Sequence, residues 1–423
     1  MKSIPKVLFI NHSVRDGGPG RSLFYILKYL DRTKVDPYVL IPKEDVFTDL
    51  VKKVGLGDKI IFEKRFPENL KRPWFDGNMF HSVGLHQKLL SRFLNAVSVT
   101  LNLIDLFSLV ITSPFLVRKK RIDLIYCNGT QAKVVGALIG FINRSPVIWH
   151  VRNIQQTRAL WLTINLLALL PVVKKIICVS GPAAEQFRFG RDKTVVIHNG
   201  IDLEDFDPEK SAGVLRSEYL IPDGSVIVGS TGRIVPRKGY EYLIRAAQTV
   251  RDRLGKDGSR VKFAVVGDTP NFFLENHIES LKGLVKELGL EDLFVFTGYK
   301  KDVRQYLKDF DVFVIPSNYP DPFPRVVIEA MSYLLPVVGF KVGGIVEAVE
   351  DGVTGFLNEP GNIDEMKEAI IKLIRDSSLR LTMGVAGRER ARKLFSAEDR
   401  SKDVEENILE VIEKFVGRGN GSI

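Results

Sequence analysis

The sequence predicts an α/β protein built from two doubly wound domains, each with a parallel sheet between layers of helices. Short, continuous apolar runs alternate with helical patterns along most of the chain, which is typical of strands buried on both faces. A length of 423 residues suits two or three domains of about 100–200 residues each. Charge also divides the chain: residues 1–200 hold 30 Lys and Arg against 14 Asp and Glu, a net charge of +16. The remainder of the 61 basic and 51 acidic residues is 31 and 37, a net charge of −6.

The first half alternates strands and helices. The expected strands are Lys6–Asn11, Tyr38–Ile41, Asp123–Cys127, Pro146–His150 and Lys175–Ser180, and the expected helices are Ser22–Leu30 and Gln131–Phe141. Because parallel strands need a crossover connection, this order indicates βαβ units.

The second half repeats the pattern. The expected strands are Ser225–Thr231, Lys262–Gly267, Leu293–Thr297, Val312–Pro316 and Pro336–Gly339, and the expected helices are Tyr240–Leu254, Ile278–Leu288, Val303–Asp309 and Pro324–Tyr333. The tail Ile363–Val416 is expected to be mostly helical, and Gly417–Ile423 to fray. The domains are expected at 1–197 and 198–395, with a terminal segment, 396–423, packing back toward the first domain.

Composition excludes several classes of protein. An apolar fraction of 45% with 26% charged residues is ordinary for a globular chain. The two cysteines, Cys127 and Cys178, lie in apolar runs, which excludes a disulfide scaffold or a Cys-ligated zinc site and suits a reducing compartment. The first apolar run is five residues long, too short for a signal peptide.

The first domain also places basic clusters beside apolar stretches. Lys64–Arg72 and Arg118–Arg121 are basic, whereas Phe93–Val117 and Ala159–Val173 are apolar. Neither stretch is a clean membrane span, because the first contains Asp105 and two Asn and the second is shorter than the roughly 20 residues needed. Two interpretations stay open: core helices, or a surface that enters lipid headgroups while Lys and Arg hold anionic lipid.

Two cations follow the first strand of the second domain. Arg233 comes directly after a strand that ends at Thr231-Gly232, and Lys238-Gly239 opens a helix. Open α/β sheets bind ligands at the carboxyl edge, and cations beside a helix N-terminus favour a diphosphate. A solvated basic loop is the alternative.

Two carboxylates follow a later strand of the same domain. Asp321 lies in a Pro-rich loop just before a helix, and Glu329 lies about two turns into that helix. Carboxylates accept hydrogen bonds from sugar hydroxyls, in bidentate fashion from a vicinal diol, and the first-turn N–H groups favour an anion. A helix cap for Asp321 and a surface acid for Glu329 are the alternatives.

Nine segments, in order along the chain, together resemble the retaining glycosyltransferases of family 4, which have the GT-B fold. They are GGPGRSL at 17–23, VIWHVRN at 147–153, ICVSGPAAEQF at 177–187, VIHNGIDLEDF at 196–206, TGRIVPRKGYEYLIRA at 231–246, AVVGD at 264–268, FTGYKKDVRQYLKDFDVFVIPS at 296–317, DPFPRVVIEAM at 321–331 and GGIVEAVEDGVTGFL at 343–357. The resemblance implies two Rossmann-like domains facing a central cleft, with the acceptor on the first domain and the nucleotide sugar on the second.

The resemblance also implies roles in the second domain. Arg233 and Lys238 match the pair that holds the nucleotide diphosphate and stabilises it as the leaving group. Asp321 matches the residue that touches the donor sugar, and Glu329 the one that touches the ribose. The remaining residues expected at the donor are Gly298, Tyr299, Phe323, Arg325 and Val326.

In the first domain, the resemblance assigns Gly17 and Gly18 to a loop whose backbone lies near the diphosphate and the acceptor. His150 matches a histidine that reaches the donor sugar, whereas the residue alone is more consistent with a core histidine. Arg152 and Asn128–Thr130 lie at the same edge and are weaker candidates for meeting the acceptor.

Two residues depart from the family pattern. Asp321 is one methylene shorter than the usual Glu, and Pro324 replaces a small residue, so that one N–H toward the donor is missing. These departures leave the choice of sugar open and keep an inactive homologue as an alternative.

The glycine loop of the first domain, Asp16–Ser22, does not match a dinucleotide fingerprint. The pattern G-x-G-x-x-G would use Gly18 and Gly20, but Leu23 occupies the third position. A dehydrogenase is therefore excluded.

The function expected from the resemblance is transfer of a sugar from a nucleotide-diphosphate sugar to an acceptor hydroxyl with retention of configuration. It needs no cofactor and no metal, since Arg233, Lys238 and helix N–H groups can hold the diphosphate. The expected acceptor is a lipid-linked or membrane-surface glycan at the inner face of the cytoplasmic membrane, with anionic lipid and not nucleic acid as a partner. A nucleotide-sugar epimerase, a sugar phosphorylase and a non-catalytic anion-binding or membrane-binding module stay as alternatives.

Overall fold

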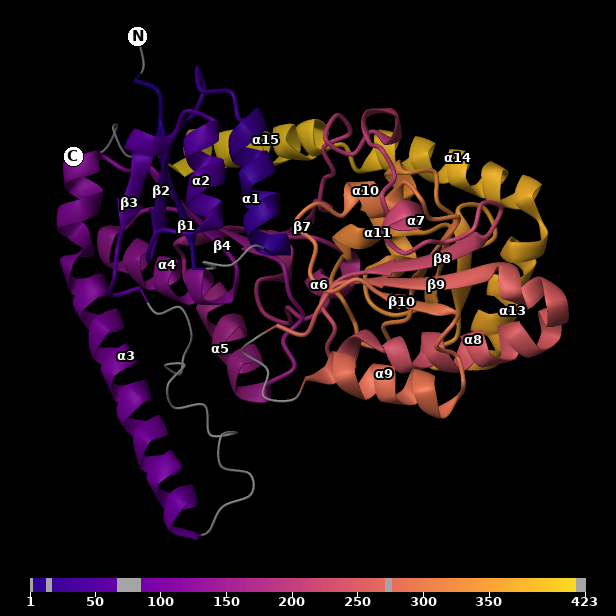
Figure 1. Cartoon of the computed structure of the whole chain (residues 1–423). Coiled ribbons are helices and arrows are strands. Elements are labelled where there is room, and N and C mark those ends of the chain that lie inside the picture. The colour runs from indigo at the N-terminus through magenta and orange to yellow at the C-terminus, as the bar shows by residue number, and fades with distance from the viewer. Residues whose placement is uncertain (1–2, 13–16, 67–84, 271–275, 416–423) are drawn as a thin grey trace. The chain divides into compact units, whose positions relative to one another are not determined.

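The structure is a computed structural model that describes residues 3–12, 17–66, 85–270 and 276–415, without the side chains of 85–96, 256, 257 and 259 (Figure 1). Parts of the features named above, namely residues 16, 67–72 and 416–423, lie outside the described residues. The chain divides into two compact units, Met1–Gly200 with Ala397–Ile423, and Ile201–Ser396.

The first unit is a seven-stranded parallel sheet in the order β3-β2-β1-β4-β5-β6-β7. The strands are β1 Lys6–Asn11, β2 Asp36–Ile41, β3 Ile60–Phe62, β4 Leu124–Asn128, β5 Val147–Val151, β6 Val173–Cys178 and β7 Thr194–Val196. The helices are α1 Gly18–Tyr29, α2 Val46–Lys53, α3 Leu85–Lys120, α4 Thr130–Asn143, α5 Arg158–Ala168, α6 Gly181–Ala184 and α15 Ala397–Phe415. Because parallel crossovers are right-handed, α1 and α2 cover one face of this sheet and α3, α4 and α5 the other.

The second unit is a six-stranded parallel sheet in the order β10-β9-β8-β11-β12-β13. Its strands are β8 Val226–Thr231, β9 Val261–Val266, β10 Phe294–Phe296, β11 Val312–Ile315, β12 Val337–Phe340 and β13 Gly355–Asn358. Its helices are α7 Leu215–Glu218, α8 Tyr240–Leu254, α9 His277–Glu287, α10 Arg304–Leu307, α11 Arg325–Ser332, α12 Ile345–Ala348, α13 Ile363–Arg375 and α14 Ser377–Leu394. The expected class of two doubly wound parallel sheets is confirmed.

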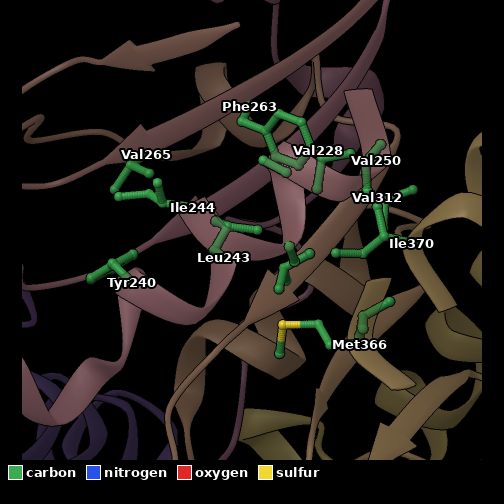
Figure 2. Packing of buried hydrophobic residues seen from close by; sticks show 14 of the residues in the cluster. Val228, Tyr240, Leu243, Ile244, Val250, Phe263, Val265, Val312, Met366 and Ile370 are labelled. Atoms are coloured by element: carbon green, nitrogen blue, oxygen red, sulfur yellow. The ribbon is translucent and has the colours of Figure 1, made fainter. Parts of the chain in front are cut away.

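Each sheet is held by an apolar core on its helix-covered faces. In the second unit, Leu243 and Ile244 of α8 and Met366 of α13 pack against strand residues such as Val228 and Phe263 (Figure 2). Burying each such side chain stabilises the fold by about 1.5–3 kcal/mol. This packing fixes the helices on the sheet and thereby fixes the loops at the strand ends.

The last helix of the chain, α15, belongs to the first unit. Its Val404, Ile408 and Val411 are buried in one cluster with Leu27 of α1 and Ile177 of β6. Three short strands, β3, β7 and β13, each lie at a sheet edge and are not predicted by the sequence pattern. Three or four residues carry too little pattern to separate a strand from a turn.

Candidate active site

The second sheet reverses its strand order between β8 and β11, and the predicted residues of that unit follow these two strands. Arg233 comes two residues after β8, Lys238 ends the 3-10 turn Pro236–Lys238 that leads into α8, and Asp321 lies between β11 and α11. Ligands of doubly wound sheets bind outside the carboxyl ends at such a reversal. The topology therefore gathers the two loops at one binding edge.

Lys238 and Asp321 form an ion pair at this edge. The Nζ atom of Lys238 lies 2.9 Å from Oδ2 of Asp321, and the side chains are 19% and 26% exposed. A pair that is partly open to solvent contributes little to stability, about 0–1 kcal/mol. Both groups are therefore available to exchange each other for a ligand.

The loops that carry this pair are tied together by backbone contacts. Gly239 has φ 67°, and a Cβ there would lie 2.3 Å from the carbonyl oxygen of Pro316. The Ser317 hydroxyl donates to the Arg237 carbonyl at 3.1 Å, and the Arg237 guanidinium lies 5.2 Å from the centre of the Tyr319 ring. Lys238 and Asp321 thus lie on two loops that are held against each other.

A third loop, after β12, supports Asp321 from behind, and the sequence analysis gave it no role. The Gly344 N–H donates to the Asp321 carbonyl at 2.8 Å. A Cβ on Gly344 would lie 2.0 Å from the Pro322 carbonyl oxygen, and one on Gly343, where φ is 65°, would lie 2.3 Å from that of Asp321. The signal in the sequence was the Gly-Gly pair that begins three residues after a strand.

Helix α11 begins beside Asp321. Pro324 is its N-cap and makes no side-chain cap, so the N–H groups of Arg325 and Val326 open the helix. Glu329 and Arg325 are both buried, with Arg325 Nη2 3.5 Å from Glu329 Oε1. This pair joins the first and second turns of α11.

Phe323 is buried, and its ring packs edge-on against Phe395 with centroids 5.3 Å apart. Its side chain therefore serves the core of the second unit, and only its backbone is left to meet a ligand. By contrast, Tyr299 is 65% exposed.

The loops after β9 and β10 complete this edge. The Gly267 N–H donates to the Gly298 carbonyl at 3.0 Å, and the Gly232 N–H donates to the Val266 carbonyl at 3.0 Å. These bonds link Gly298 and Tyr299 through Gly267 to the stretch that carries Arg233.

The first sheet reverses its order between β1 and β4. The strand register aligns Asn11 with Asn128 and Asn128 with His150, so three polar residues lie side by side at the carboxyl edge. Asn128 Nδ2 donates to Asn11 Oδ1 at 2.9 Å and to the Pro19 carbonyl at 3.0 Å. The second bond fixes the start of α1, where Gly17 is the N-cap and Gly18 the first helical residue, against the end of β4.

Arg152 joins this row to the end of the unit. Its Nε donates to Asn128 Oδ1 at 2.5 Å and its Nη1 to Asn199 Oδ1 at 2.6 Å, and the residue is buried. The Ser22 hydroxyl also donates to Asn199, at 3.2 Å. Asn11 and Asn199 were not found from the sequence, because their partners lie 47 to 177 residues away.

His150 is buried, and its Nδ1 faces two donors, the Tyr126 hydroxyl and, at 3.3 Å, Arg152 Nη2. Burial, then the charges of Arg152 and Lys133, hold the pKa of His150 well below its ordinary value. A neutral imidazole that accepts at Nδ1 carries its proton on Nε2. That Nε2 is buried and has no hydrogen-bond partner in the described part of the chain.

Lys133 of α4 is a second buried base that sequence reasoning missed. Its side chain is fully buried, and its Nζ has no hydrogen-bond partner among residues that the structure describes. Burial lowers the pKa of Lys133 to about 8, partly offset by the neighbouring Cys178 and Cys127 thiols. The described residues contain no group of three or more His, Cys, Asp or Glu side chains arranged to hold a metal ion.

Two protein-family models match the chain. Glycosyltransferase Family 4 matches residues 16–205, and Glycosyl transferases group 1 matches residues 213–390. The chain is 33% identical over 201 residues to the D-inositol 3-phosphate glycosyltransferase of Kribbella flavida, an alignment that covers 47% of each chain, so it spans about half the length of that relative. It is 28% identical over 303 residues to the capsular polysaccharide biosynthesis glycosyltransferase CapM of Staphylococcus aureus, covering 67% of this chain and 75% of CapM.

Among solved structures, the chain is similar to Anabaena Alr3699/HepE in complex with UDP. The TM-score is 0.75 at 25% sequence identity, covering 96% of this chain and 100% of that one. A crystal structure of the same protein in complex with UDP-glucose gives a TM-score of 0.74, again at 25% identity, covering 96% and 99%.

Proposed function

Because the chain belongs to the group 1 glycosyl transferases of the GT-B fold, with a Family 4 first half, we propose that it transfers a sugar from a nucleotide-diphosphate sugar to an acceptor hydroxyl. The Anabaena relative, whose structures hold UDP and UDP-glucose, supports a uridine diphosphate sugar as the donor. The second unit holds this donor, and the first unit receives the acceptor.

The Lys238–Asp321 pair carries the proposal. A diphosphate needs a cation, and a sugar hydroxyl needs an acceptor such as a carboxylate. Since the two groups are 2.9 Å apart, a donor whose diphosphate meets Lys238 brings its sugar to Asp321.

The reaction develops negative charge on the departing diphosphate. Arg233, Lys238 and the first-turn N–H groups of α11 stabilise that charge, so transfer needs no metal ion. We assign retention of the anomeric configuration, with the departing phosphate oxygen taking the acceptor proton, on the ground of the family resemblance.

His150 supplies a directed donor in the first unit. Its Nε2–H is held in one tautomer by Tyr126 and Arg152, and on the ground of the family resemblance we assign it as a hydrogen-bond donor to a sugar oxygen. A neutral donor suits a sugar hydroxyl better than an imidazolium, because it binds without adding charge beside an electron-poor anomeric carbon.

The acceptor that we propose is a lipid-linked or membrane-surface glycan, in polysaccharide or cell-envelope synthesis at the inner face of the cytoplasmic membrane. CapM, which acts in capsular polysaccharide biosynthesis, supports a glycan acceptor. The net charge of +16 in residues 1–200 suits a phosphate-bearing acceptor.

Calorimetric titration with UDP tests the donor site. Arg233→Ala and Lys238→Ala should each weaken UDP binding by about tenfold or more, since each removes a charge-assisted contact. Lys341→Ala is the matched control, because Lys341 is a half-exposed lysine of the same unit, paired with Asp351 and Glu359. Equal binding by all four proteins would contradict the proposal.

A panel of UDP-sugars, incubated with and without a glycan acceptor, tests the reaction itself. The expected product keeps the anomeric configuration of the donor by NMR, and a metal chelator leaves the rate unchanged. Conversion of the sugar without an acceptor would instead identify an epimerase, and release of a sugar 1-phosphate in inorganic phosphate would identify a phosphorylase.

A further inference from the structure

Helix α3 exposes large apolar side chains, while its buried side is mixed and includes Leu109, Val110 and Val117 as well as polar residues. Its buried side chains include Ser98, Asn102 and Ser113, whereas Phe107 is 68% and Phe115 72% exposed. The exposed apolar row, spaced three to four residues apart, also includes Leu103, Ile104 and Ile111. In the described chain, residues Val97–Lys120 form the one helix long and apolar enough to cross a membrane, and most of it is not buried. A helix with polar residues inside and large apolar residues outside suits a non-aqueous surrounding.

The exposed apolar row continues on the two helices that share this face of the sheet. On α4 the exposed residue is Phe141, and on α5 they are Leu162 and Leu166. Because α3, α4 and α5 cover the same side of the first sheet (Figure 1), we group these exposed residues and the α3 row as one surface. We call it the three-helix face.

The charge around the three-helix face is strongly positive. Between residues 106 and 184 the chain has ten Lys and Arg and a single acid, Asp123, although Lys133 and Arg152 are buried and Lys175 pairs with Glu410 of α15. Arg118, Lys119 and Arg121 are exposed at the end of α3, Arg144 is exposed after α4, and Arg158 begins α5. Asp123 accepts a hydrogen bond from the backbone of Lys6 at 2.8 Å, so it is engaged within the unit.

Polar contacts hold α3 along the unit. Arg65 Nη1 donates to the Ser108 hydroxyl at 3.1 Å and to that of Thr112 at 2.9 Å. On the other side, Asn143 Nδ2 of α4 donates to Ser113 Oγ at 2.9 Å. A helix that crossed a bilayer would carry this polar side into hydrocarbon and lose these partners, which is costly.

We propose that the three-helix face docks the first unit on an anionic lipid bilayer, with α3 lying in the plane of the interface. The apolar row enters the headgroup and acyl boundary, and the surrounding Lys and Arg meet lipid phosphates. Docking on lipid does not itself depend on the proposed function. Only its purpose rests on that function, namely to bring the enzyme to a lipid-linked acceptor.

The direction of α3 connects the three-helix face to the first-unit site. In a βαβ crossover the helix runs against the strands, so α3 passes the carboxyl edge of the sheet, where Asn128 and His150 lie, and its first turns extend beyond that edge (Figure 1). A bilayer against α3 therefore reaches the edge to which the acceptor is assigned. A glycan on a lipid phosphate can enter that edge while its lipid stays in the bilayer.

Co-sedimentation with vesicles tests the surface. The full chain should pellet with equimolar phosphatidylglycerol–phosphatidylcholine vesicles and much less with phosphatidylcholine alone, and added salt should release it. Phe107→Ser combined with Phe115→Ser should weaken vesicle binding by about tenfold or more, as should Arg118→Glu with Lys119→Glu. Leu381→Ser with Val385→Ser, two exposed apolar residues on α14, is the matched control and should bind as the wild type does.

Three results would overturn the proposal. The first is vesicle binding that the double Phe variant leaves unchanged. The second is a wild-type dimer in sedimentation that this variant dissociates, which would assign the face to a second copy. The third is wild-type protein that resists extraction from vesicles by alkaline carbonate, which would mean that α3 crosses the bilayer. UDP titration of the same variants separates the two proposals, because loss of vesicle binding with intact UDP binding concerns the surface alone.

Discussion

The two units share one topology and differ at their functional edges. Each sheet reverses its strand order once, between β1 and β4 or between β8 and β11. The second unit places an ion pair there, Lys238 with Asp321, partly open to solvent. The first unit places a buried row of amides and bases there, tied by Arg152.

The difference suggests a division of work. Exposed opposite charges can exchange partners when a charged ligand arrives, which suits capture of a nucleotide diphosphate. A buried network keeps one geometry because every broken bond leaves an unsatisfied group, which suits orientation of neutral hydroxyls. Substitutions at the two edges should therefore affect nucleotide binding and sugar orientation separately.

The largest effect is expected for Asp321→Ala. Transfer should fall by about 100-fold or more, because the donor sugar loses its hydrogen-bond acceptor. UDP binding should be retained, since Lys238 keeps its charge and loses a competing carboxylate. Steady-state kinetics beside UDP calorimetry measures both, and Asp321→Glu should recover most of the rate. Parallel loss of UDP binding would mean that Asp321 serves capture.

His150→Ala should lower kcat by about 10-fold to 100-fold, because the Nε2–H donor disappears. The affinity for UDP should match that of the wild type, since the diphosphate is assigned to the second unit. His150→Gln, which keeps an N–H donor, should recover part of the rate while thermal unfolding stays similar. An unchanged kcat in His150→Ala would show that the first unit does not orient the sugar through His150.

Gly344→Ala should destabilise the second unit by about 2 kcal/mol, because the new Cβ would overlap the Pro322 carbonyl and displace the Asp321 loop. Gly283→Ala is the matched control in α9, where a Cβ meets nothing within 4 Å, and it should stabilise by about 0.5–1 kcal/mol. Urea unfolding compares the two. Equal urea midpoints for the two variants would show that the loop after β12 accommodates the added Cβ without a loss of stability.

The smallest effect is expected for Lys133→Met, which should stabilise the first unit by on the order of 1 kcal/mol at pH 7. The pKa of Lys133 is lowered from 10.5 to about 8 by burial, so between these values the unfolded wild type binds more protons than the folded one. Wild-type stability therefore rises with pH across that window, and the advantage of the variant shrinks there. If the difference in unfolding free energy between the variant and the wild type stayed constant from pH 7 to pH 10, that would contradict a buried amine with a lowered pKa.

The sequence predicted the second unit's edge better than the first. Arg233 and Lys238 stand in one short stretch, as do Asp321 and Glu329, so a strand-then-helix pattern was enough to place them. The row Asn11, Asn128 and His150 depends on strand register between distant segments, which no local pattern encodes, and Asn199 is joined to it through Arg152. Phe323 shows the opposite limit, since its place in the motif gave no sign that its ring packs on Phe395.

Helix α3, which contains the apolar stretch Phe93–Val117, fits neither the core interpretation nor the lipid-surface interpretation alone. Leu109, Val110 and Val117 of α3 are core residues, while Phe107 and Phe115 of the same helix are exposed. Periodicity could predict a helix here, but it could not say which stripe meets the sheet, because both stripes contain apolar residues.

Helix α15 has a consequence for how the protein is made. Its Val404, Ile408 and Val411 complete the core of a unit that begins at the first residues of the chain. During synthesis on a ribosome, the N-terminal 200 residues must therefore wait, with an apolar face uncovered, until the whole insert Ile201–Ser396 has emerged. The nascent chain is thus able to finish its central unit before its first one, and chaperone demand should peak late in translation.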